Sequence, residues 1–249
     1  MTDREIDTSV LVTTFRRPGH LRLVLESIAA QRGVVGAYEI VVSDDGSNDG
    51  TAEIVTNFAA EAAVAVRFTT QPHEGFRLAR VRNNAARLAR GRYLLFLDGD
   101  CVLPQHHLAA HQARRRPGLA LLGYCARLTE AASRPLLDQG LAGIDLAPLI
   151  TGEEARLLSL RHRRARWHAL IRHPTKPRLA GGDFGVWRAD FEQVNGFDER
   201  FEGWGQEDDD LGLRLRAAGL RLASILDATC SLHVWHPTDP TATRRWRDG

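Results

Sequence analysis

Short apolar runs alternate with amphipathic stretches through the first hundred residues of the chain. The apolar runs are rich in β-branched residues, as strands are, whereas the stretches between them repeat apolar residues at helical spacing. Because strands that alternate with helices form right-handed βαβ units, this pattern predicts a mostly parallel sheet with helices on both faces. The predicted strands cover 9–14, 38–43, 64–69 and 93–97, and the predicted helices cover 18–31, a stretch from 51, and 78–90.

The second half of the chain has a less regular pattern. We expect all 249 residues to form a single α/β domain. In it, 8–126 and 127–236 are two halves of one fold, and 237–249 is a polar tail. The predicted elements of the second half are strands at 119–128 and 178–187, one or two strands within 220–235, and helices at 153–171 and 206–218.

Composition excludes several classes of protein. The chain has 33 Lys and Arg against 31 Asp and Glu, a formal net charge of +2, and 43% hydrophobic residues. These values are those of an ordinary globular domain. Because the positive and negative charges nearly balance, they give no reason to expect a nucleic-acid partner. No run reaches the roughly 18 apolar residues that a membrane-spanning helix needs.

The cysteines and the amino terminus favour a cytoplasmic protein. Cys101, Cys125 and Cys230 are odd in number and widely spaced, which suits neither a disulfide framework nor a zinc pattern. The chain begins with polar and acidic residues, where a signal peptide would be basic and then apolar. A basic segment at 153–178 suits peripheral contact with the inner face of a membrane, although an ordinary amphipathic helix has the same pattern.

Candidate ligand-binding residues follow the predicted strands, since ligands of such sheets bind beyond the carboxyl ends of strands. Asp98 and Asp100 could share one divalent cation that keeps open positions for phosphates, although a solvated turn has the same sequence. Asp44 could accept a hydrogen bond from the ring N–H of uracil, thymine or guanine, or it could hold an Asx turn. Arg77 and Arg82 could bind diphosphate or ribose, or form a solvated basic face.

Carboxylates and histidines in the last fifty residues form a second group of candidates. Four carboxylates at 207–210 begin a predicted helix. Four are more than favourable interaction with the helix dipole requires, so we expect one or two of them to face the site. One of them could be the general base for a sugar hydroxyl. Trp204 offers a flat face for a sugar ring. His233 and His236 are three residues apart, so in an extended segment only one is expected to face a metal.

Five motifs in order resemble the family 2 glycosyltransferases of the GT-A fold. The resemblance runs from about residue 9 to residue 236. The stretch Gly203-Trp-Gly-Gln-Glu-Asp208 is its most specific part and is similar to the acceptor-side motif of β-1,4-galactosyltransferases and bacterial chondroitin polymerases. The motifs are Val10-Leu-Val-Thr-Thr-Phe15, Asp44-Asp-Gly-Ser47, Arg82-Asn83, Phe96-Leu-Asp-Gly-Asp-Cys101 and 194–211.

The resemblance implies a metal-dependent, inverting glycosyltransferase with a Rossmann-like α/β fold. Such an enzyme moves a hexosyl or N-acetylhexosaminyl group from a nucleotide-diphosphate donor, here a UDP-sugar by preference, to a hydroxyl of a glycan or glycolipid. The product would be a cell-surface polysaccharide or lipopolysaccharide. The alternatives are a catalytically silent glycan- or nucleotide-binding protein and a sugar-1-phosphate nucleotidyltransferase. The latter would want a Gly-rich loop with lysine after the first strand, where 13–19 has one glycine and no lysine.

The same resemblance implies a role for individual residues. Asp208 matches the catalytic base, and Asp100 and His233 match ligands of Mn²⁺ or Mg²⁺. Asp183 stands where relatives often have Asn, so a sugar identity is not transferred across it. The implied acceptor-binding residues are Trp204, Glu207 and Asp183. The implied nucleotide-binding residues are Thr13, Phe15, Asp44, Arg77 and Asp98.

Overall fold

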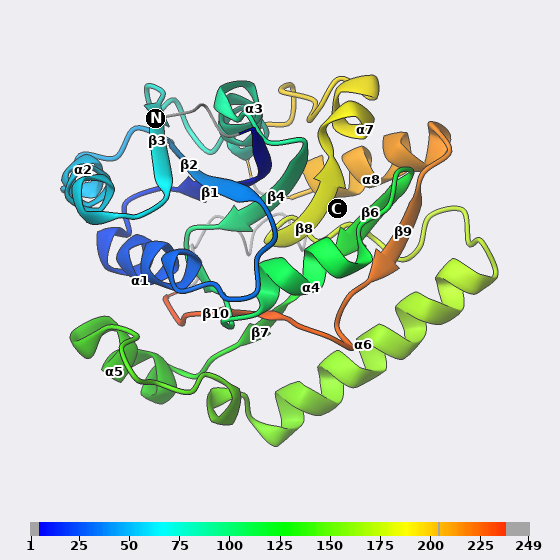
Figure 1. The fold of residues 1–249 in the computed structure, drawn as a ribbon. Helices are drawn as coiled ribbons and strands as arrows, with labels where there is room; N and C mark the ends of the chain where they lie inside the picture. The colour runs from blue at the N-terminus through cyan, green and yellow to red at the C-terminus, as the bar shows by residue number, and fades with distance from the viewer. Residues whose placement is uncertain (1–4, 204, 238–249) are drawn as a thin grey trace.

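Two sheets make up the β structure of the computed structural model, which describes residues 5–203 and 205–237. The large sheet contains β1 (Ile6–Thr14), β2 (Ala37–Asp44), β3 (Ala65–Thr70), β4 (Tyr93–Asp98), β6 (Leu119–Leu122), β8 (Asp183–Trp187) and β9 (Arg221–Ser224). The small sheet contains β5 (Cys101–Val102), β7 (Cys125–Arg127) and β10 (Ser231–His233). Their orders are β3-β2-β1-β4-β8-β6-β9 and β5-β10-β7 (Figure 1).

The large sheet is mostly parallel, as the alternating pattern predicts. Strands β3, β2, β1 and β4 are parallel neighbours, and β6 is parallel to β9. The antiparallel strand β8 separates these two groups, because it pairs with both β4 and β6. In the pairing of β4 with β8, Tyr93 lies opposite Trp187 and Leu97 lies opposite Asp183. The strand therefore lies beside the end of β4 that carries Asp98.

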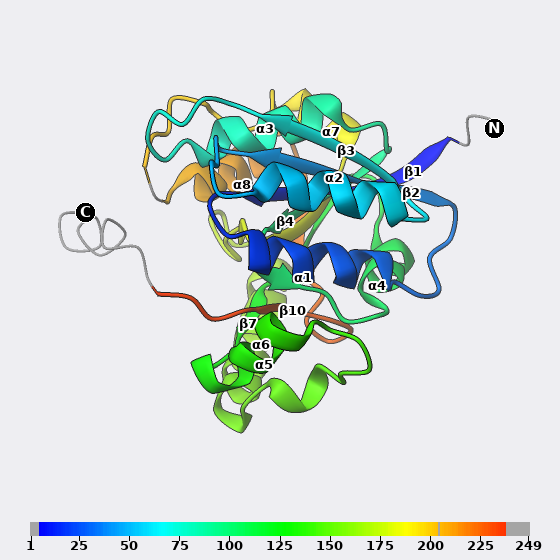
Figure 2. The ribbon, with the colours of Figure 1, turned by 90° about the vertical axis from the view of Figure 1, so that its left-hand side faces the viewer.

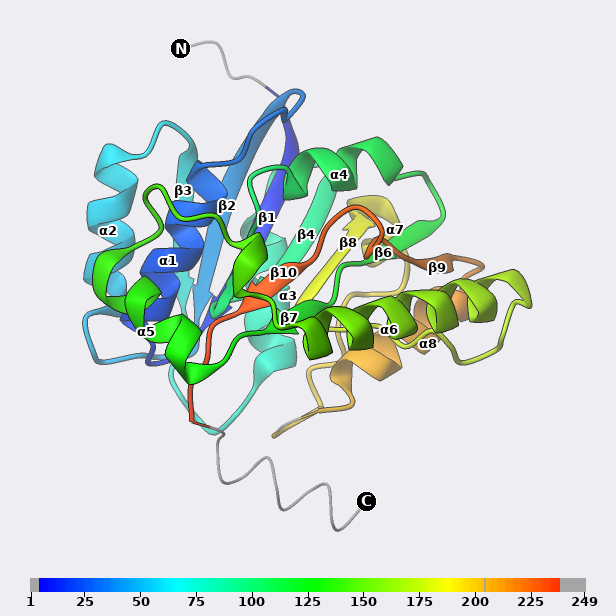
Figure 3. The ribbon, with the colours of Figure 1, turned by 90° about the horizontal axis from the view of Figure 1, so that it is seen from below.

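Helices cover both faces of the large sheet (Figure 2). One face carries α1 (Pro18–Ala29), α2 (Thr51–Glu61) and α4 (His107–Arg114), and the other carries α3 (Leu78–Leu88), α7 (Arg188–Gln193) and α8 (Glu207–Ala217). Figure 3 shows α5 (Glu130–Gln139) and α6 (Gly152–Leu170) beside the small sheet, and a 3₁₀ turn covers Ala147–Leu149. None of the helices in the described ranges combines the length and the apolar character that crossing a membrane requires.

Side chains that alternate along the strands build two cores. In β4, Leu95 and Leu97 face the core that contains α1, whereas Leu94 and Phe96 face the core that contains α3 and α8. A strand covered on both faces therefore has an almost continuous apolar sequence. Phe96 stacks on Phe184 with ring centroids 4.6 Å apart, and the rings of Phe191 and Phe197 lie 5.2 and 5.5 Å from it.

Several predicted elements differ from those in the structure. The prediction of a single strand at 119–128 is wrong, because the chain turns at Gly123 and Tyr124 and its two ends join different sheets. Tyr124 has a φ of 53°, which no strand accommodates. The strand predicted at 178–187 begins only at Asp183, and helices α4, α5 and α7 were not predicted. Residues 238–249 of the predicted tail lie outside the described residues.

The aromatic cluster predicts the effect of Phe96→Ala. Removing a fully buried ring that contacts three others should lower the free energy of unfolding by about 3–5 kcal/mol. Urea denaturation followed by circular dichroism measures this change. The control Val35→Ala, at a side chain that is 75% exposed, should stay within about 0.5 kcal/mol. A loss below about 1 kcal/mol for Phe96→Ala would show that the cluster does not carry this core.

Candidate active site

The carboxyl ends of β1, β2 and β4 bring separate parts of the sequence together at one edge of the large sheet. Thr13 lies opposite Asp98 of β4, and Thr14 lies opposite Asp44 of β2. The Thr13 hydroxyl is 3.4 Å from Oδ1 of Asp98. Gly99 makes the turn after β4 possible, since a Cβ there would lie 2.7 Å from the carbonyl oxygen of Thr13. The sheet therefore positions Asp98 and Asp100 against the end of β1.

Asp100, His233 and His236 form a cluster of potential metal ligands. Strand β10 places them, because it pairs antiparallel with β5 and sets His233 opposite Cys101. Nε2 of His233 lies 3.7 Å from Oδ1 of Asp100, and Nε2 of His236 lies 3.2 Å from Oδ2. The ligand atoms of all three side chains lie within 4.8 Å of one another. One carboxylate and two imidazoles suit a divalent transition metal, so these residues fit the predicted ion.

The expectation that the two histidines point to opposite faces is wrong, because both rings lie beside Asp100. Strand β10 ends at His233, so the alternation of an extended strand does not continue, and the two rings lie 4.9 Å apart. Arg17, which follows β1, also pairs with Oδ2 of Asp100 at 3.0 Å. Burial alone would raise the pKa of Asp100, but the hydrogen bond with His236 and the charges of both histidines and Arg17 hold it well below its usual range.

Arg82 of α3 is a buried cation that joins two predicted site residues. Its side chain is 2% exposed, with Nη2 3.0 Å from Oδ1 of Asp98 and Nη1 3.0 Å from Oε1 of Glu207. The interpretation of Arg82 as part of a solvated basic face is therefore wrong, whereas a contact of Arg82 with diphosphate or ribose stays a prediction. The position of Arg82 could have revealed its burial, since it lies three residues from Ala79 and Ala85 on the apolar stripe of the helix.

The backbone of Gly181 and Gly182 packs directly against these charged groups. A Cβ on Gly181 would lie 2.6 Å from Nη2 of Arg82, and one on Gly182 would lie 3.0 Å from Oδ2 of Asp98. The Gly182 carbonyl accepts a hydrogen bond from the backbone N–H of Asp98, and the Gly181 N–H donates one to Oδ2 of Asp208. A side chain at Gly181 would therefore displace the Arg82 guanidinium, and one at Gly182 would press against Asp98.

The four carboxylates that open α8 divide into two pairs. Asp209 and Asp210 form ion pairs with Arg178 and Arg214, away from Arg82. Glu207 is buried, and its Oε2 has no hydrogen-bond partner among the described residues.

Burial raises the pKa of Glu207, and the neighbouring Asp208 adds to this rise, while Arg82 opposes it. Asp208 is half-buried and accepts hydrogen bonds from the backbone N–H groups of Gly181 and Asp209. The predicted base and one predicted acceptor residue thus begin the same helix. Trp204 lies outside the described residues.

One predicted nucleotide-binding residue, Phe15, belongs to an aromatic pair. Phe15 stacks on His73 with ring centroids 4.2 Å apart and planes 13° from parallel. Nδ1 of His73 lies 3.0 Å from Oδ2 of Asp45, so a carboxylate fixes that ring. Arg77 forms ion pairs with Glu74 and Glu202. Sequence reasoning missed His73, which lies after β3 with no motif around it.

Asp44 holds a turn, as the Asx-turn interpretation predicts. Its carboxylate is 2% exposed and accepts hydrogen bonds from the backbone N–H and hydroxyl of Ser47 and from the hydroxyl of Thr70. These bonds orient the loop between β2 and α2. The predicted contact of Asp44 with a nucleobase stays a prediction.

Asp183 does not reach this group of residues. It is 0% exposed and faces His107 and His111 of α4, because its side chain points to the opposite face of β8 from Gly182. The prediction that Asp183 binds the acceptor is therefore wrong. The direction of the Asp183 side chain depends on where β8 begins in the sheet, and the sequence does not reveal that position.

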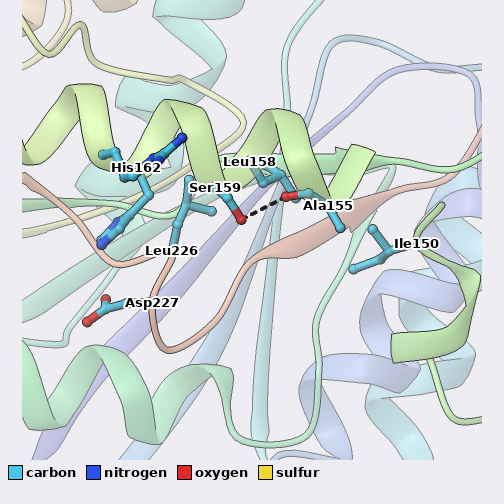
Figure 4. Close-up of a pocket in the computed structure, with 8 residues that line it drawn as sticks. Ile150, Ala155, Leu158, Ser159, His162, Leu226 and Asp227 are labelled. Atoms are coloured by element: carbon cyan, nitrogen blue, oxygen red, sulfur yellow. Dashed lines mark hydrogen bonds between the residues drawn. The ribbon is translucent and has the colours of Figure 1, made fainter. Parts of the chain in front are cut away.

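A hollow of about 580 Å³ lies elsewhere, between α6 and the loop after β9 (Figure 4). Leu158 and His162 of α6 face Leu226 and Asp227 across it. None of the predicted site residues lines this hollow. The candidate active site is therefore assigned from its side-chain chemistry and its place at the strand ends.

Comparisons with known proteins match two parts of the chain to glycosyltransferases. Residues 9–115 match the family model described as glycosyl transferase family 2, and residues 161–236 match the one described as the N-terminal domain of galactosyltransferase. The validoxylamine A glucosyltransferase of Streptomyces hygroscopicus subsp. jinggangensis is 34% identical over 85% of this chain and 52% of its own length. The chondroitin synthase of Escherichia coli is 24% identical over 95% of this chain and 36% of its own. The chain thus spans about half of the first relative and about a third of the second.

Solved structures show the same fold. The mannosyltransferase PcManGT from Pyrobaculum calidifontis, in complex with GDP-Man and Mn²⁺, covers 99% of this chain and 63% of its own, with a TM-score of 0.67 and 20% identity. The S. aureus TarS 1–349 complex with UDP-GlcNAc covers 96% of this chain and 61% of its own, with a TM-score of 0.64 and 17% identity. The fold is GT-A, as the motifs predict.

The buried ion group predicts the effect of Arg82→Met. Without its cation, the group leaves Asp98 and buried Glu207 uncompensated, so the free energy of unfolding should fall by about 3–5 kcal/mol. Urea denaturation measures this loss. Arg200→Met is the matched control, because Arg200 is 91% exposed where it pairs with Asp198, and its loss should be far smaller than that of Arg82→Met. Equal losses in the two variants would contradict the assigned role of Arg82.

Proposed function

Because the chain belongs to the family 2 glycosyltransferases, with a galactosyltransferase-like segment at 161–236, we propose that it transfers a sugar from a nucleotide-diphosphate donor to an acceptor hydroxyl. The observation that carries this proposal is the presence of a potential metal cluster and a carboxylate base on the same fold. Asp100 with two histidines forms the cluster, and Asp208 is the base. In the proposed transfer, the configuration at the anomeric carbon is inverted.

Asp100, His233 and His236 are the proposed metal ligands. Two imidazoles and one carboxylate favour Mn²⁺ over Mg²⁺, because Mg²⁺ prefers oxygen ligands. A bound ion would neutralise the charge that develops on the leaving diphosphate. Arg17 shares Oδ2 of Asp100 and is 35% exposed, so its guanidinium can turn from that carboxylate to the phosphates of the donor.

Asp208 is the proposed general base. It would take the proton of the acceptor hydroxyl while the hydroxyl oxygen attacks the anomeric carbon. Two backbone N–H groups fix the position of its carboxylate. Glu207 and Asp98 are bound to Arg82, so neither is a free nucleophile for a two-step reaction. This pairing supports a single displacement with inversion, in which Glu207 positions the acceptor.

The donor is proposed to be a UDP-sugar. The stacked ring of Phe15 offers a flat surface for the base, and the Thr13 hydroxyl and Asp98 carboxylate offer hydrogen bonds to ribose. Uridine remains favoured on the argument that Asp44 pairs with a ring N–H, and Arg77 remains the proposed second contact. The 34% identity with a validoxylamine A glucosyltransferase supports a hexosyl group as the one transferred.

The proposed acceptor is a hydroxyl of a glycan or glycolipid, in the synthesis of cell-surface polysaccharide or lipopolysaccharide. Peripheral membrane contact in the cytoplasm is part of the same proposal. It is supported by exposed apolar side chains on the basic helix α6, where Trp167 is 60% exposed and Leu170 is 74% exposed. Flotation with anionic vesicles tests this contact separately from the reaction.

The metal cluster predicts that Asp100→Asn loses metal-dependent turnover. Because the carboxylate is the only anion of the cluster's three ligands, we expect a loss of at least about 100-fold in kcat/KM, together with loss of Mn²⁺ binding. Donor turnover over a titration of Mn²⁺ and isothermal calorimetry with Mn²⁺ measure the two effects. Asp138→Asn, at an exposed position, should behave as wild type. Full activity of wild type in excess chelator would contradict the metal proposal.

The general-base assignment predicts that Asp208→Asn lowers kcat by about 10²–10⁴-fold and leaves donor affinity near that of wild type. A panel of UDP-, GDP- and dTDP-sugars with Mn²⁺ first identifies the donor by thermal shift, and calorimetry then gives its Kd for each variant. Asp209→Asn is the matched control, since its side chain pairs with Arg178. Donor binding without turnover in wild type over a broad acceptor panel would favour the silent binding protein instead.

A further inference from the structure

Three fully buried side chains between α4 and β8 take no part in the proposed reaction. His107 and His111 lie one turn apart on α4, and Asp183 faces them from β8. Their exposed fractions are 0%, 1% and 0%. Nε2 of His107 lies 3.3 Å from Oδ1 of Asp183, and Nε2 of His111 lies 3.7 Å from the same atom. Two imidazoles and a carboxylate therefore converge on one point.

A hydroxyl group fixes the outer nitrogen of each histidine. Nδ1 of His107 lies 2.9 Å from the hydroxyl oxygen of Thr229, and Nδ1 of His111 lies 3.2 Å from the hydroxyl oxygen of Tyr93. Both rings are thus held with Nε2 toward Asp183. Histidines that bind metals are commonly oriented in this way, through a hydrogen bond at the nitrogen that does not bind.

The inner atoms of the cluster have no hydrogen-bond partner among the described residues. These atoms are Nε2 of His107, Nε2 of His111 and both carboxylate oxygens of Asp183. Buried polar atoms are almost always hydrogen-bonded or bound to an ion. Four such atoms around one point are suited to hold a cation.

The distances and the donor set suit zinc. Ligand atoms about 2.0–2.1 Å from a tetrahedral ion lie about 3.3 Å from one another, which is close to the two nitrogen–oxygen separations. All three ligand atoms lie within 4.8 Å of one another.

We propose that His107, His111 and Asp183 bind a structural Zn²⁺ that joins α4 to β8. The site shares no ligand with the Asp100 cluster, because the two groups consist of different side chains. The proposal does not depend on the transferase activity. Since the ligands are buried, the ion would enter as the chain folds.

Zinc content of the Asp100→Asn/His236→Ala variant tests the site without changing it. These substitutions remove two ligands of the other cluster, so any tightly held zinc must lie elsewhere. After refolding with Zn²⁺ and exhaustive dialysis, elemental analysis should find about one zinc ion per chain. A content below about 0.1 per chain would overturn the proposal, since the three side chains would then form an ion pair without metal.

His111→Gln in the same background locates the ion. It should lose the zinc, whereas the control His106→Gln, at an exposed residue just before α4, should keep it. Equal zinc in the two variants would overturn the proposal.

A spectroscopic measurement covers the case in which His111→Gln does not fold. Refolding the Asp100→Asn/His236→Ala variant with Co²⁺ should give the strong visible absorption of a tetrahedral site, and Asp183→Asn, which keeps the shape of the side chain, should weaken or shift it. An unchanged spectrum in Asp183→Asn would overturn the assignment. A chelator added during refolding should also lower the Tm by several degrees relative to the zinc-loaded variant.

Discussion

A buried arginine holds the candidate site together. Arg82 lies on α3, yet its guanidinium bridges the end of β4 and the beginning of α8 through Asp98 and Glu207. A cation this buried is stable only when its anions stay in place, because the lost hydration must be replaced by both carboxylates. The two glycines at 181–182 let the chain pass close enough to complete the arrangement. The positions of β4, α3 and α8 are thus fixed relative to one another by one charged group.

This constraint gives similar carboxylates different environments. Glu207 and Asp98 share the charge of Arg82, Asp100 is surrounded by two histidines and Arg17, and Asp208 accepts hydrogen bonds from two backbone N–H groups. Groups of the same type can therefore serve as acceptor contact, ribose contact, metal ligand and base in one site. The division follows from which element carries each residue, since only the first turn of α8 brings Glu207 to Arg82 and leaves Asp208 beside Gly181.

The sequence predicts this site well where chemistry follows local periodicity. The parallel strands and the turn at Asp98 and Asp100 are recognisable because apolar runs alternate with helical repeats. His236 was not predicted as facing Asp100, because the end of β10, rather than the alternation of a strand, sets its direction. Asp183 was misplaced for a similar reason, since its face of the sheet depends on the register of an antiparallel strand whose start is not visible in the pattern. Both errors concern contacts between segments far apart in the chain.

The proposed zinc site and the candidate active site meet at one strand. Gly182 packs against Asp98 on one face of β8, and the next residue, Asp183, faces the histidines of α4 on the other. Gly182 is bonded directly to Asp183, the first residue of β8, so an ion that fixes Asp183 also restrains the Gly182 carbonyl, which accepts a hydrogen bond from the N–H of Asp98. Asp208 depends on the same segment through Gly181. A structural ion at α4 would therefore hold the base and the end of β4 in position without touching substrate, because residues that contact the reacting groups keep their geometry only when their own neighbours are fixed.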